Sequence, residues 1–238
     1  MSTVDTQIHD LAIANRILAR EGVVDAYGHV AIRHPDRPEH YQLSRSRSPE
    51  LVCRDDIVAY DTEGVAVDGD SRKPYTERFI HGAIFEARSD VNAIVHNHAY
   101  SMLPFSVTKT PLKPIWHTAV GMGATIPVWD IRDKFGDTNL LVVNMDQGRD
   151  LAIGLGANTI ALMRGHGCVV AGQSLKEAVA VFAQLNATML LQAHQLGTEI
   201  TYLSDGEVAE GMKMLRSSVM SMERAWEYFS ERADLGGI

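Results

Sequence analysis

Two histidines separated by one residue lie inside a short apolar run, Ile94-Val95-His96-Asn97-His98. An extended strand sends alternate side chains to the same face, so His96 and His98 are predicted to project together. The run therefore favours a strand that aims two imidazoles at one point. The spacing alone decides little, because 10 of the 238 residues are histidines and chance pairs are common.

A third histidine, His166, lies far downstream between two glycines in Arg164-Gly165-His166-Gly167. Glycine permits tight backbone conformations, so this segment can turn the His166 ring toward the pair on the strand. Three imidazole nitrogens without a fourth protein ligand are typical of a catalytic metal site, which keeps one position open for water or substrate. We therefore predict that His96, His98 and His166 bind one divalent metal ion.

Charge and composition exclude several classes of partner. The formal net charge is −8 and the acidic residues are scattered, which disfavours a nucleic-acid partner. Two cysteines are too few for a disulfide framework, so we expect a reduced, cytoplasmic protein. Residues 1–10 lack the pattern of a signal peptide, and no window approaches 18 consecutive apolar residues. We expect neither secretion nor membrane insertion.

Apolar periodicity runs through the chain without a linker, a repeat or a low-complexity tract, so residues 1–238 are predicted to form a single domain. An amphipathic helix is predicted near residues 11–18, and strands are predicted over 27–33, 41–43, 56–60 and 65–67 as an antiparallel meander. A helix capped by Thr76 and buried through Phe79 to Ala87 should precede the His96 strand.

The second half continues this pattern. Strands are predicted over 126–128, 140–143, 160–163 and 168–170, with a short helix over 146–155. Two helices then close the chain. The first opens with a capping box at 174–177, buries Val179, Phe182, Leu185 and Met189, and ends at Gly197. The second opens at 204–207 and carries Met212, Leu215, Val219, Met222 and Trp226. Helices at the ends with strands between them predict an α/β sandwich.

The order and spacing of three segments carry a family likeness. Thr76-Glu77-Arg78-Phe79-Ile80-His81, followed by Val91 to His98 and later by Arg164 to Gly167, resembles the class II aldolase/adducin family over nearly the whole chain. The resemblance implies a three-layer α/β/α sandwich around a central, mainly antiparallel sheet. It also implies a homotetramer or higher homo-oligomer with active sites at subunit contacts.

The same resemblance assigns roles to particular residues. The histidines matching His96, His98 and His166 hold a divalent metal in that family, usually zinc and in some members manganese. Glu77, nineteen positions before His96, matches the carboxylate that handles protons. Taken alone, Glu77 would be interpreted as a surface charge favoured by the first turn of a helix. His81, one turn further on, is predicted to be a core residue or to support the site.

This sequence departs from the sugar-phosphate aldolases of the family where they bind phosphate. Their Gly-Asn, Thr-Gly and Ser-Ser pairs are replaced by Gly28-His29, Ser46-Arg47 and Tyr75-Thr76. Bulkier side chains stand where small phosphate-binding groups are expected, which argues against a phosphorylated sugar. The tyrosine that a neighbouring subunit offers in those aldolases falls near His117, and their late tyrosine has no clear counterpart near residues 216–218.

The segment Ser44-Arg45-Ser46-Arg47-Ser48 is the predicted anion site of this remodelled pocket. Two arginines two positions apart on an extended turn share a face and offer forked donors to a carboxylate. Without context, an Arg/Ser turn is usually a solvated loop. The resemblance places this turn at the active site, so we predict that the substrate contacts His29, Ser44, Arg45, Ser46 and Arg47.

The replacements together resemble the decarboxylase branch of the family. We predict a non-oxidative decarboxylase of a hydroxylated aromatic or heteroaromatic (di)carboxylate, such as a dihydroxyphthalate, that uses zinc or else manganese, iron or cobalt. The metal would hold the charge of an enolate-like carbanion, and Glu77 or His117 would deliver the ring proton. A retro-aldolase acting on a non-phosphorylated hydroxy-acid or aldehyde is the alternative. A metal-free, adducin-like assembly module is the third hypothesis.

Overall fold

The computed structural model describes residues 3–67, 69–177, 179–233 and 235–238, and it contains a seven-stranded sheet in the order β3-β2-β1-β4-β7-β6-β5. Every neighbouring pair is antiparallel except β5 and β6, which are parallel. The strands are β1 His29–Arg33, β2 His40–Ser44, β3 Ile57–Asp61, β4 Ala93–Asn97, β5 Val128–Trp129, β6 Ile160–Met163 and β7 Gly167–Gly172. The predicted mainly antiparallel sheet is confirmed, and so is the meander at its start.

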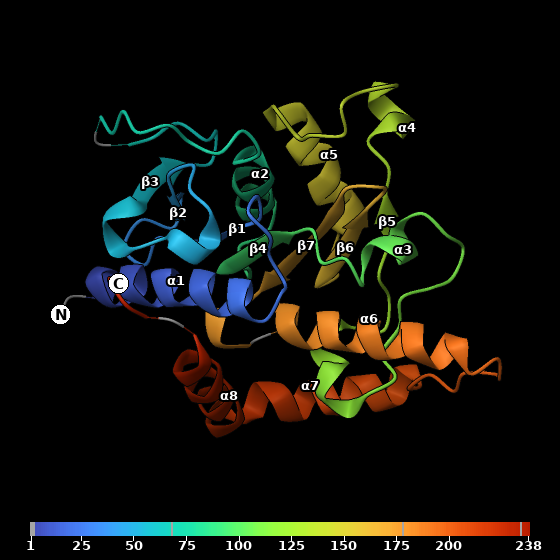
Figure 1. The fold of residues 1–238 in the computed structure, drawn as a ribbon. Coiled ribbons are helices and arrows are strands. Elements are labelled where there is room, and N and C mark those ends of the chain that lie inside the picture. The colour runs from blue at the N-terminus through green and yellow to red at the C-terminus, as the bar shows by residue number, and fades with distance from the viewer. Residues whose placement is uncertain (1–2, 68, 178, 234) are drawn as a thin grey trace.

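Helices cover both faces of this sheet (Figure 1). On one side lie α2 and α5, and on the other lie α1 and α6, so the predicted three-layer sandwich is confirmed. The α-helices are α1 Thr3–Arg20, α2 Phe79–Ala87, α3 Leu103–Ser106, α4 Arg132–Phe135, α5 Met145–Leu155, α6 Val179–Gln195, α7 Asp205–Ser217 and α8 Val219–Arg232. Short 3-10 helices are η1 Pro49–Leu51, η2 Arg54–Asp56, η3 His117–Met122 and η4 Leu175–Glu177.

The alternation of side chains along the central strands divides the apolar interior into two cores. Ile32 of β1 packs in the core beneath α1, whereas Ala31 and the neighbouring Ile94 of β4 pack in the core beneath α2. His29 and His96 lie two residues from Ala31 and Ile94, so they share the α2 face. They are also direct partners in the β1–β4 ladder. The sheet therefore places two buried imidazoles side by side below α2.

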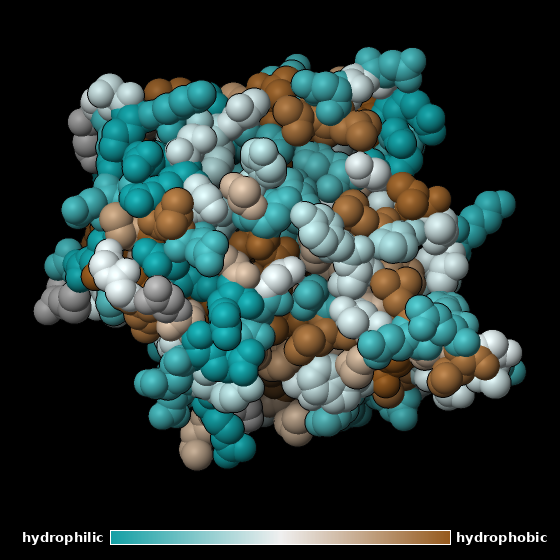
Figure 2. All heavy atoms as spheres, in the orientation of Figure 1, coloured by the Kyte–Doolittle hydropathy of each residue, from teal (hydrophilic) through white to brown (hydrophobic). Residues whose placement is uncertain are grey.

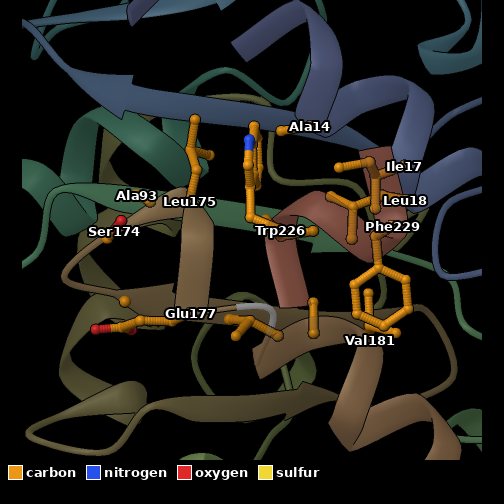
Figure 3. A pocket seen from close by; sticks show the side chains of 14 residues that line it. Ala14, Ile17, Leu18, Ala93, Ser174, Leu175, Glu177, Val181, Trp226 and Phe229 are labelled. Carbon is orange, nitrogen blue, oxygen red and sulfur yellow. The ribbon is translucent and has the colours of Figure 1, made fainter. Parts of the chain in front are cut away.

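A small apolar cavity of about 50 Å³ lies in the other core, between α1, η4 and α8 (Figure 3). Ile17, Leu175, Trp226 and Phe229 contribute to its walls. These residues belong to or pack against the core beneath α1, on the face of the sheet opposite to His96. The cavity is therefore separate from the histidine cluster.

The face of the molecule in Figure 2 mixes hydrophilic and apolar residues. Apolar residues gather over the part of this view where α5 lies in Figure 1, and Ile153 of α5 is 76% exposed. Among the described residues, none of the helices combines the length and the apolar character that crossing a bilayer requires.

The predicted strand over residues 140–143 is wrong. Its four successive amides donate to side-chain oxygens rather than to a neighbouring strand; the acceptors are Thr138, Asn139, Glu77 and Gln147. Leu140 also has a φ of 68°, in the left-handed region, which no strand can accommodate. Apolar composition predicted burial here, whereas the side-chain hydrogen bonds fold the segment into a loop.

Two details of the first half also differ from the sequence prediction. Residues 65–67 form a single bridge between Tyr60 and Ala66 rather than a strand. Thr76 does not cap the helix that follows: α2 begins at Phe79, and its N-cap is Arg78, which makes no side-chain capping bond. Thr76 lies instead in a turn that lines a large pocket.

The start and the buried face of α6 differ from the sequence prediction. The predicted capping box at Ser174 is not formed, because the Glu177 carboxylate accepts from the Gln173 amide rather than from Ser174, and this stretch forms η4. On α6 the buried face is offset: Phe182 and Met189 are half-buried and Leu185 is exposed, whereas Val181, Ala183, Ala187 and Leu190 are buried. The Val179 side chain lies outside the described part of the chain.

The predicted capping box of the last segment is confirmed, since Ser204 and Glu207 exchange hydrogen bonds at the start of α7. The single long helix predicted after it is wrong. Ser218 has φ −109° and ψ 76°, which separates α7 from α8, and the Ser217 hydroxyl donates to the Met214 carbonyl. A serine hydroxyl that bonds to the preceding turn competes with helix propagation.

Candidate metal centre

Four side chains converge at the edge of the sheet where β4 ends and β7 begins. His96 lies in β4 and His98 directly follows it, His166 lies in the turn between β6 and β7, and Glu77 precedes α2. One ligand atom from each of the four lies within 4.8 Å of every other. The three imidazole centroids are 5.0, 5.0 and 5.2 Å apart. The structure thus brings the predicted histidines together and adds Glu77.

The glycines beside His166 explain how the turn reaches the strand. Gly165 has a φ of 65°, in the left-handed region that glycine adopts without strain. A Cβ on Gly167 would lie 2.2 Å from the Asn97 carbonyl oxygen and 2.9 Å from the His98 ring. Only a residue without a side chain allows β7 to approach β4 this closely, and that approach sets the position of His166 relative to His98.

Each of the three imidazoles has an acceptor at Nδ1. His96 Nδ1 lies 3.2 Å from the Cys168 carbonyl oxygen, and His166 Nδ1 lies 2.9 Å from that of Leu140. His98 Nδ1 lies 3.1 Å from both carboxylate oxygens of Asp25. A neutral ring that donates from Nδ1 carries a bare lone pair on Nε2.

The three Nε2 atoms are buried, and no hydrogen-bond partner for them exists among the described residues. Buried polar atoms are normally paired, so three orphaned acceptors that face one another require an explanation. A divalent cation provides one, because neutral imidazole nitrogens and a carboxylate oxygen are common ligands of zinc and related metals. The residues present therefore fit a divalent metal.

Asp25 was not predicted from the sequence. Its Oδ1 accepts hydrogen bonds from the Tyr27 and Gly28 amides at 2.8 and 3.1 Å, which forms a turn just before β1. Burial alone would raise the pKa of the Asp25 carboxyl, but those amides and His98 hold it below its ordinary value. An aspartate two residues before a Tyr-Gly pair signals such a turn, but nothing in the sequence links it to His98.

The loop over residues 138–143 supports two members of the cluster at once. The strained backbone of Leu140 directs its carbonyl at His166, and the Val142 amide donates to Glu77 Oε1 at 2.9 Å. A non-glycine residue with positive φ is uncommon and is often found where function fixes a backbone group. The loop therefore fixes the orientation of both His166 and Glu77.

Glu77 is 8% exposed and uses its two oxygens differently. Oε1 accepts from Val142, whereas Oε2 lies 3.4 Å from His166 Nε2 and 3.7 Å from His96 Nε2. Oε2 therefore faces the bare nitrogens of two imidazoles, at the place where a cation would lie. The sequence alone had favoured an exposed position, whereas the family resemblance had favoured the site.

A pocket of about 540 Å³ opens over the cluster. Its size lies within the range of small-molecule sites. The lining includes the predicted His29 and Ser46, three members of the cluster, Glu77, His98 and His166, and also Tyr27, Tyr75, Thr76, Asn139, Leu140, Leu141 and Gly165. The sequence did not single out Asn139 or Leu141, because residues 140–143 were predicted to form a strand and Asn139 precedes it.

The two arginines of the predicted anion site already have a partner. Arg45 Nε and Arg47 Nη1 lie 2.7 and 2.6 Å from the two carboxylate oxygens of buried Asp56. Burial would raise the pKa of Asp56, but the Cys53 amide and thiol and the two arginines lower it. Their forked donors hold a carboxylate as expected, but in this structure that carboxylate belongs to the protein.

Of the other predicted substrate residues, Ser44 lies behind the pocket wall and His29 lies in it. Ser44 is buried, and its hydroxyl lies 3.1 Å from that of Tyr75, behind the pocket wall. His29 lies in the wall, and its Nδ1 lies 2.6 Å from Nε2 of His81, which is completely buried on α2. Burial lowers the pKa of His29 well below its ordinary value and lowers that of His81 to about 3.

His117 lies elsewhere in this chain. It is exposed at the start of η3, beside Trp116, and η3 packs against α6 and α7. Among the described residues, those that line the pocket over the cluster do not include His117. The structure of one chain therefore does not bring His117 to Glu77.

Comparison with known proteins identifies the family. The model of the class II aldolase and adducin N-terminal domain matches residues 9–193, and the chain belongs to that family. It is 31% identical to the decarboxylase tropJ of Talaromyces stipitatus, over 93% of this chain and 92% of that protein. It is 27% identical to the 3,4-dihydroxyphthalate decarboxylase of Arthrobacter keyseri, over 84% of each chain.

Solved structures agree on the fold. An L-fuculose 1-phosphate aldolase from Glaciozyma antarctica superposes with a TM-score of 0.77 at 19% identity, over 96% of this chain and 90% of that one. The named relatives are decarboxylases and aldolases, which are carbon–carbon lyases, and the chain is an enzyme of this class.

Proposed function

We propose that this protein is a divalent-metal-dependent, non-oxidative decarboxylase of a hydroxylated aromatic or heteroaromatic (di)carboxylate, with dihydroxyphthalates as the first substrates to test. The observation that carries the proposal is the convergence of three bare Nε2 atoms and Glu77 in a pocket of about 540 Å³. Two decarboxylases among its relatives support the reaction type, and one of them is named for a dihydroxyphthalate.

His96, His98 and His166 would hold the metal, while Asp25 and the carbonyls of Cys168 and Leu140 keep their rings in the required tautomer. A divalent ion bound there supplies a Lewis acid that stabilises negative charge on substrate oxygens. Zinc, manganese, iron or cobalt would suit three imidazoles and a carboxylate. The pocket residues Ser46 and His29 would orient the substrate.

Loss of CO2 breaks the bond between the ring carbon and the carboxylate, leaves the electron pair on the ring carbon, and requires one proton there. Within this chain Glu77 is the proposed acid, and the proton it moves would be carried by Oε2, because Oε1 accepts from the Val142 amide. Glu77 would first take the proton of the substrate hydroxyl and then deliver the same proton to the ring carbon, so the step needs no other acid. His117, the other proposed donor, would act at the site of a neighbouring subunit.

We further propose a homotetramer, or a larger homo-oligomer, with sites at subunit contacts. Tyr27 lines the pocket and is 73% exposed, and Tyr100, two residues after His98, is 74% exposed. Exposed aromatic side chains are typical of surfaces that a partner covers, and one of these two tyrosines, Tyr27, lies at the pocket itself. Arg45 and Arg47, which pair with Asp56, would stabilise the Ser46 turn. A substrate carboxylate could bind only to those guanidinium N–H groups that Asp56 does not use.

The decisive experiment is a panel of hydroxyaromatic acids assayed for CO2 release after zinc, manganese, iron or cobalt is restored to stripped protein. We expect release from at least one ortho-hydroxy carboxylate, and its loss in His96→Ala together with the metal. Release that is unchanged in His96→Ala would refute the proposal.

The retro-aldolase hypothesis remains the alternative, because sugar-phosphate aldolases share this fold. Residues 28–29, 46–47 and 75–76 carry bulkier side chains than a phosphate cradle uses, and His29 and Tyr75 occupy the pocket wall. An aldehyde product in place of CO2 would favour it. Protein purified without any bound metal and without activity would instead favour an adducin-like assembly module.

A further inference from the structure

A second pair of imidazoles lies beside the metal cluster and is not needed to hold the metal. His29 begins β1 and is 1% exposed, and His81 lies in α2, above the sheet, and is completely buried (Figure 1). His29 Nδ1 and His81 Nε2 are 2.6 Å apart, which is a short hydrogen bond between two rings. One proton lies between these nitrogens, and it belongs to one ring or the other.

The far nitrogen of His81 indicates which ring carries that proton. His81 Nδ1 is buried and has no hydrogen-bond partner among the described residues. A proton on this Nδ1 would leave a buried N–H donor unsatisfied, which is costly in the protein interior. Orphaned buried N–H groups are rarer in proteins than under-satisfied acceptors. The favoured tautomer of His81 therefore carries its proton on Nε2 and donates it to His29 Nδ1.

This arrangement fixes the tautomer of His29. A neutral imidazole that accepts at Nδ1 carries its own proton on Nε2. Since Nδ1 is occupied by His81, Nε2 is the nitrogen that the ring can offer to the pocket it lines. The His29 ring is also packed between Tyr75 and His96, with centroids 4.6 and 5.0 Å away, which restricts its rotation.

We propose that His81 is a positioning residue that holds His29 as a neutral Nε2–H donor, so that the pocket selects substrates with an anionic or carbonyl oxygen at this point. The inference rests on the proposed function for its substrate class, a carboxylate or phenolate beside the metal. His29 donates a hydrogen bond to the substrate oxygen and transfers no proton. A substrate that presented a hydrogen-bond donor there would meet a second donor and would be rejected.

The tautomer can be measured without any substrate. In full-length protein labelled with 15N-histidine, long-range 15N–1H correlation spectra distinguish rings protonated on Nε2 from those protonated on Nδ1. His29→Asn and His81→Gln assign the two signals by removing one each. We expect both rings to be protonated on Nε2. A His29 ring protonated on Nδ1 would overturn the inference even if the enzyme proves to be a decarboxylase.

Two variants of His81 separate positioning from a merely structural role. His81→Leu removes the donor and should reduce kcat/KM about 10- to 100-fold, mainly through KM, which corresponds to one hydrogen bond to a charged oxygen. His81→Gln places an amide donor near His29 Nδ1 and should recover most of that loss. Metal content should equal that of the wild type in both variants.

A matched control is His34→Gln, since His34 is also buried but lies away from the pocket and accepts from the Asp36 and Arg37 amides. It should leave kcat/KM unchanged. Unaltered kcat/KM in His81→Leu, or loss of metal in step with activity, would overturn the positioning role. If no aromatic acid is turned over by the wild-type enzyme, the proposed function fails, while the NMR measurement still decides the tautomer.

Discussion

Replacing Asp25 by asparagine tests how the protein prepares His98 for a metal. The Asp25 carboxylate makes two sets of hydrogen bonds. Oδ1 accepts from the Tyr27 and Gly28 amides, and both oxygens lie 3.1 Å from His98 Nδ1. Asparagine keeps one oxygen for the turn, whereas its amide nitrogen cannot accept a hydrogen bond from His98. Asp25→Asn should therefore preserve the fold and weaken only the charge-assisted bond that orients the ring.

Loss of such a partner behind a metal ligand typically costs about 10- to 100-fold in metal affinity. That range equals about 1.4–2.8 kcal/mol of binding free energy. The measurement is competition for zinc with a chromophoric chelator at pH 7, paired with a thermal melt. Asp70→Asn is the matched control, because Asp70 also accepts from an amide two residues on, that of Arg72, and loses the same charge. Zinc affinity of Asp25→Asn within about twofold of the control would refute the reasoning.

Three further predictions concern other parts of the site. Glu77→Gln should lower kcat for CO2 release about 10²- to 10⁴-fold while the melting temperature is kept, and an unchanged kcat would exclude Glu77 as the acid. Gly167→Ala places a Cβ against the Asn97 carbonyl and should reduce the bound metal measured by mass spectrometry. Gly206→Ala on α7 should not, because its Cβ would meet Ser204 Oγ at an ordinary 3.8 Å. Asp56→Asn should lower the free energy of unfolding by about 1.5–3 kcal/mol at pH 7. The folded-state pKa of Asp56 is lowered, so this contribution is present above the ordinary pKa of ~3.9 and is lost as the pH falls through the folded-state pKa. Urea titrations at pH 7 and pH 3 should show the difference shrinking, and a constant difference would contradict the ion-pair explanation.

The sequence predicted those parts of the fold that depend on periodicity. Alternation around Ile94 and His96 identified a strand and its functional face, because a period of two has a direct structural meaning. Helical spacing identified α1, α2 and α5 in the same way. The approach of His166 to that strand was predictable from its flanking glycines, although the pairing of β4 with β7 was not.

Other parts of the structure could not be predicted from the sequence. They depend on side chains that make the hydrogen bonds or ion pairs for which the sequence suggested another partner. Residues 140–143 have the composition of a strand, yet Glu77, Gln147 and two nearby polar residues take their amides. The partner of Arg45 and Arg47 was equally hidden, because Asp56 meets them only after β2 and β3 pair. Asp25 was missed as a support for the same reason, because its contact with His98 spans 73 positions along the chain. His81 was predicted as a core or supporting residue, but its partner His29, 52 positions away, was not.

The most direct test of the central claim is X-ray absorption on stripped protein reloaded with zinc. The account predicts about one zinc ion per chain, with three imidazole nitrogens at about 2.0–2.1 Å and at least one oxygen ligand, and loss of the bound ion in His96→Ala. A zinc ion bound without histidine, or binding that survives in His96→Ala with the same ligand set, would contradict it.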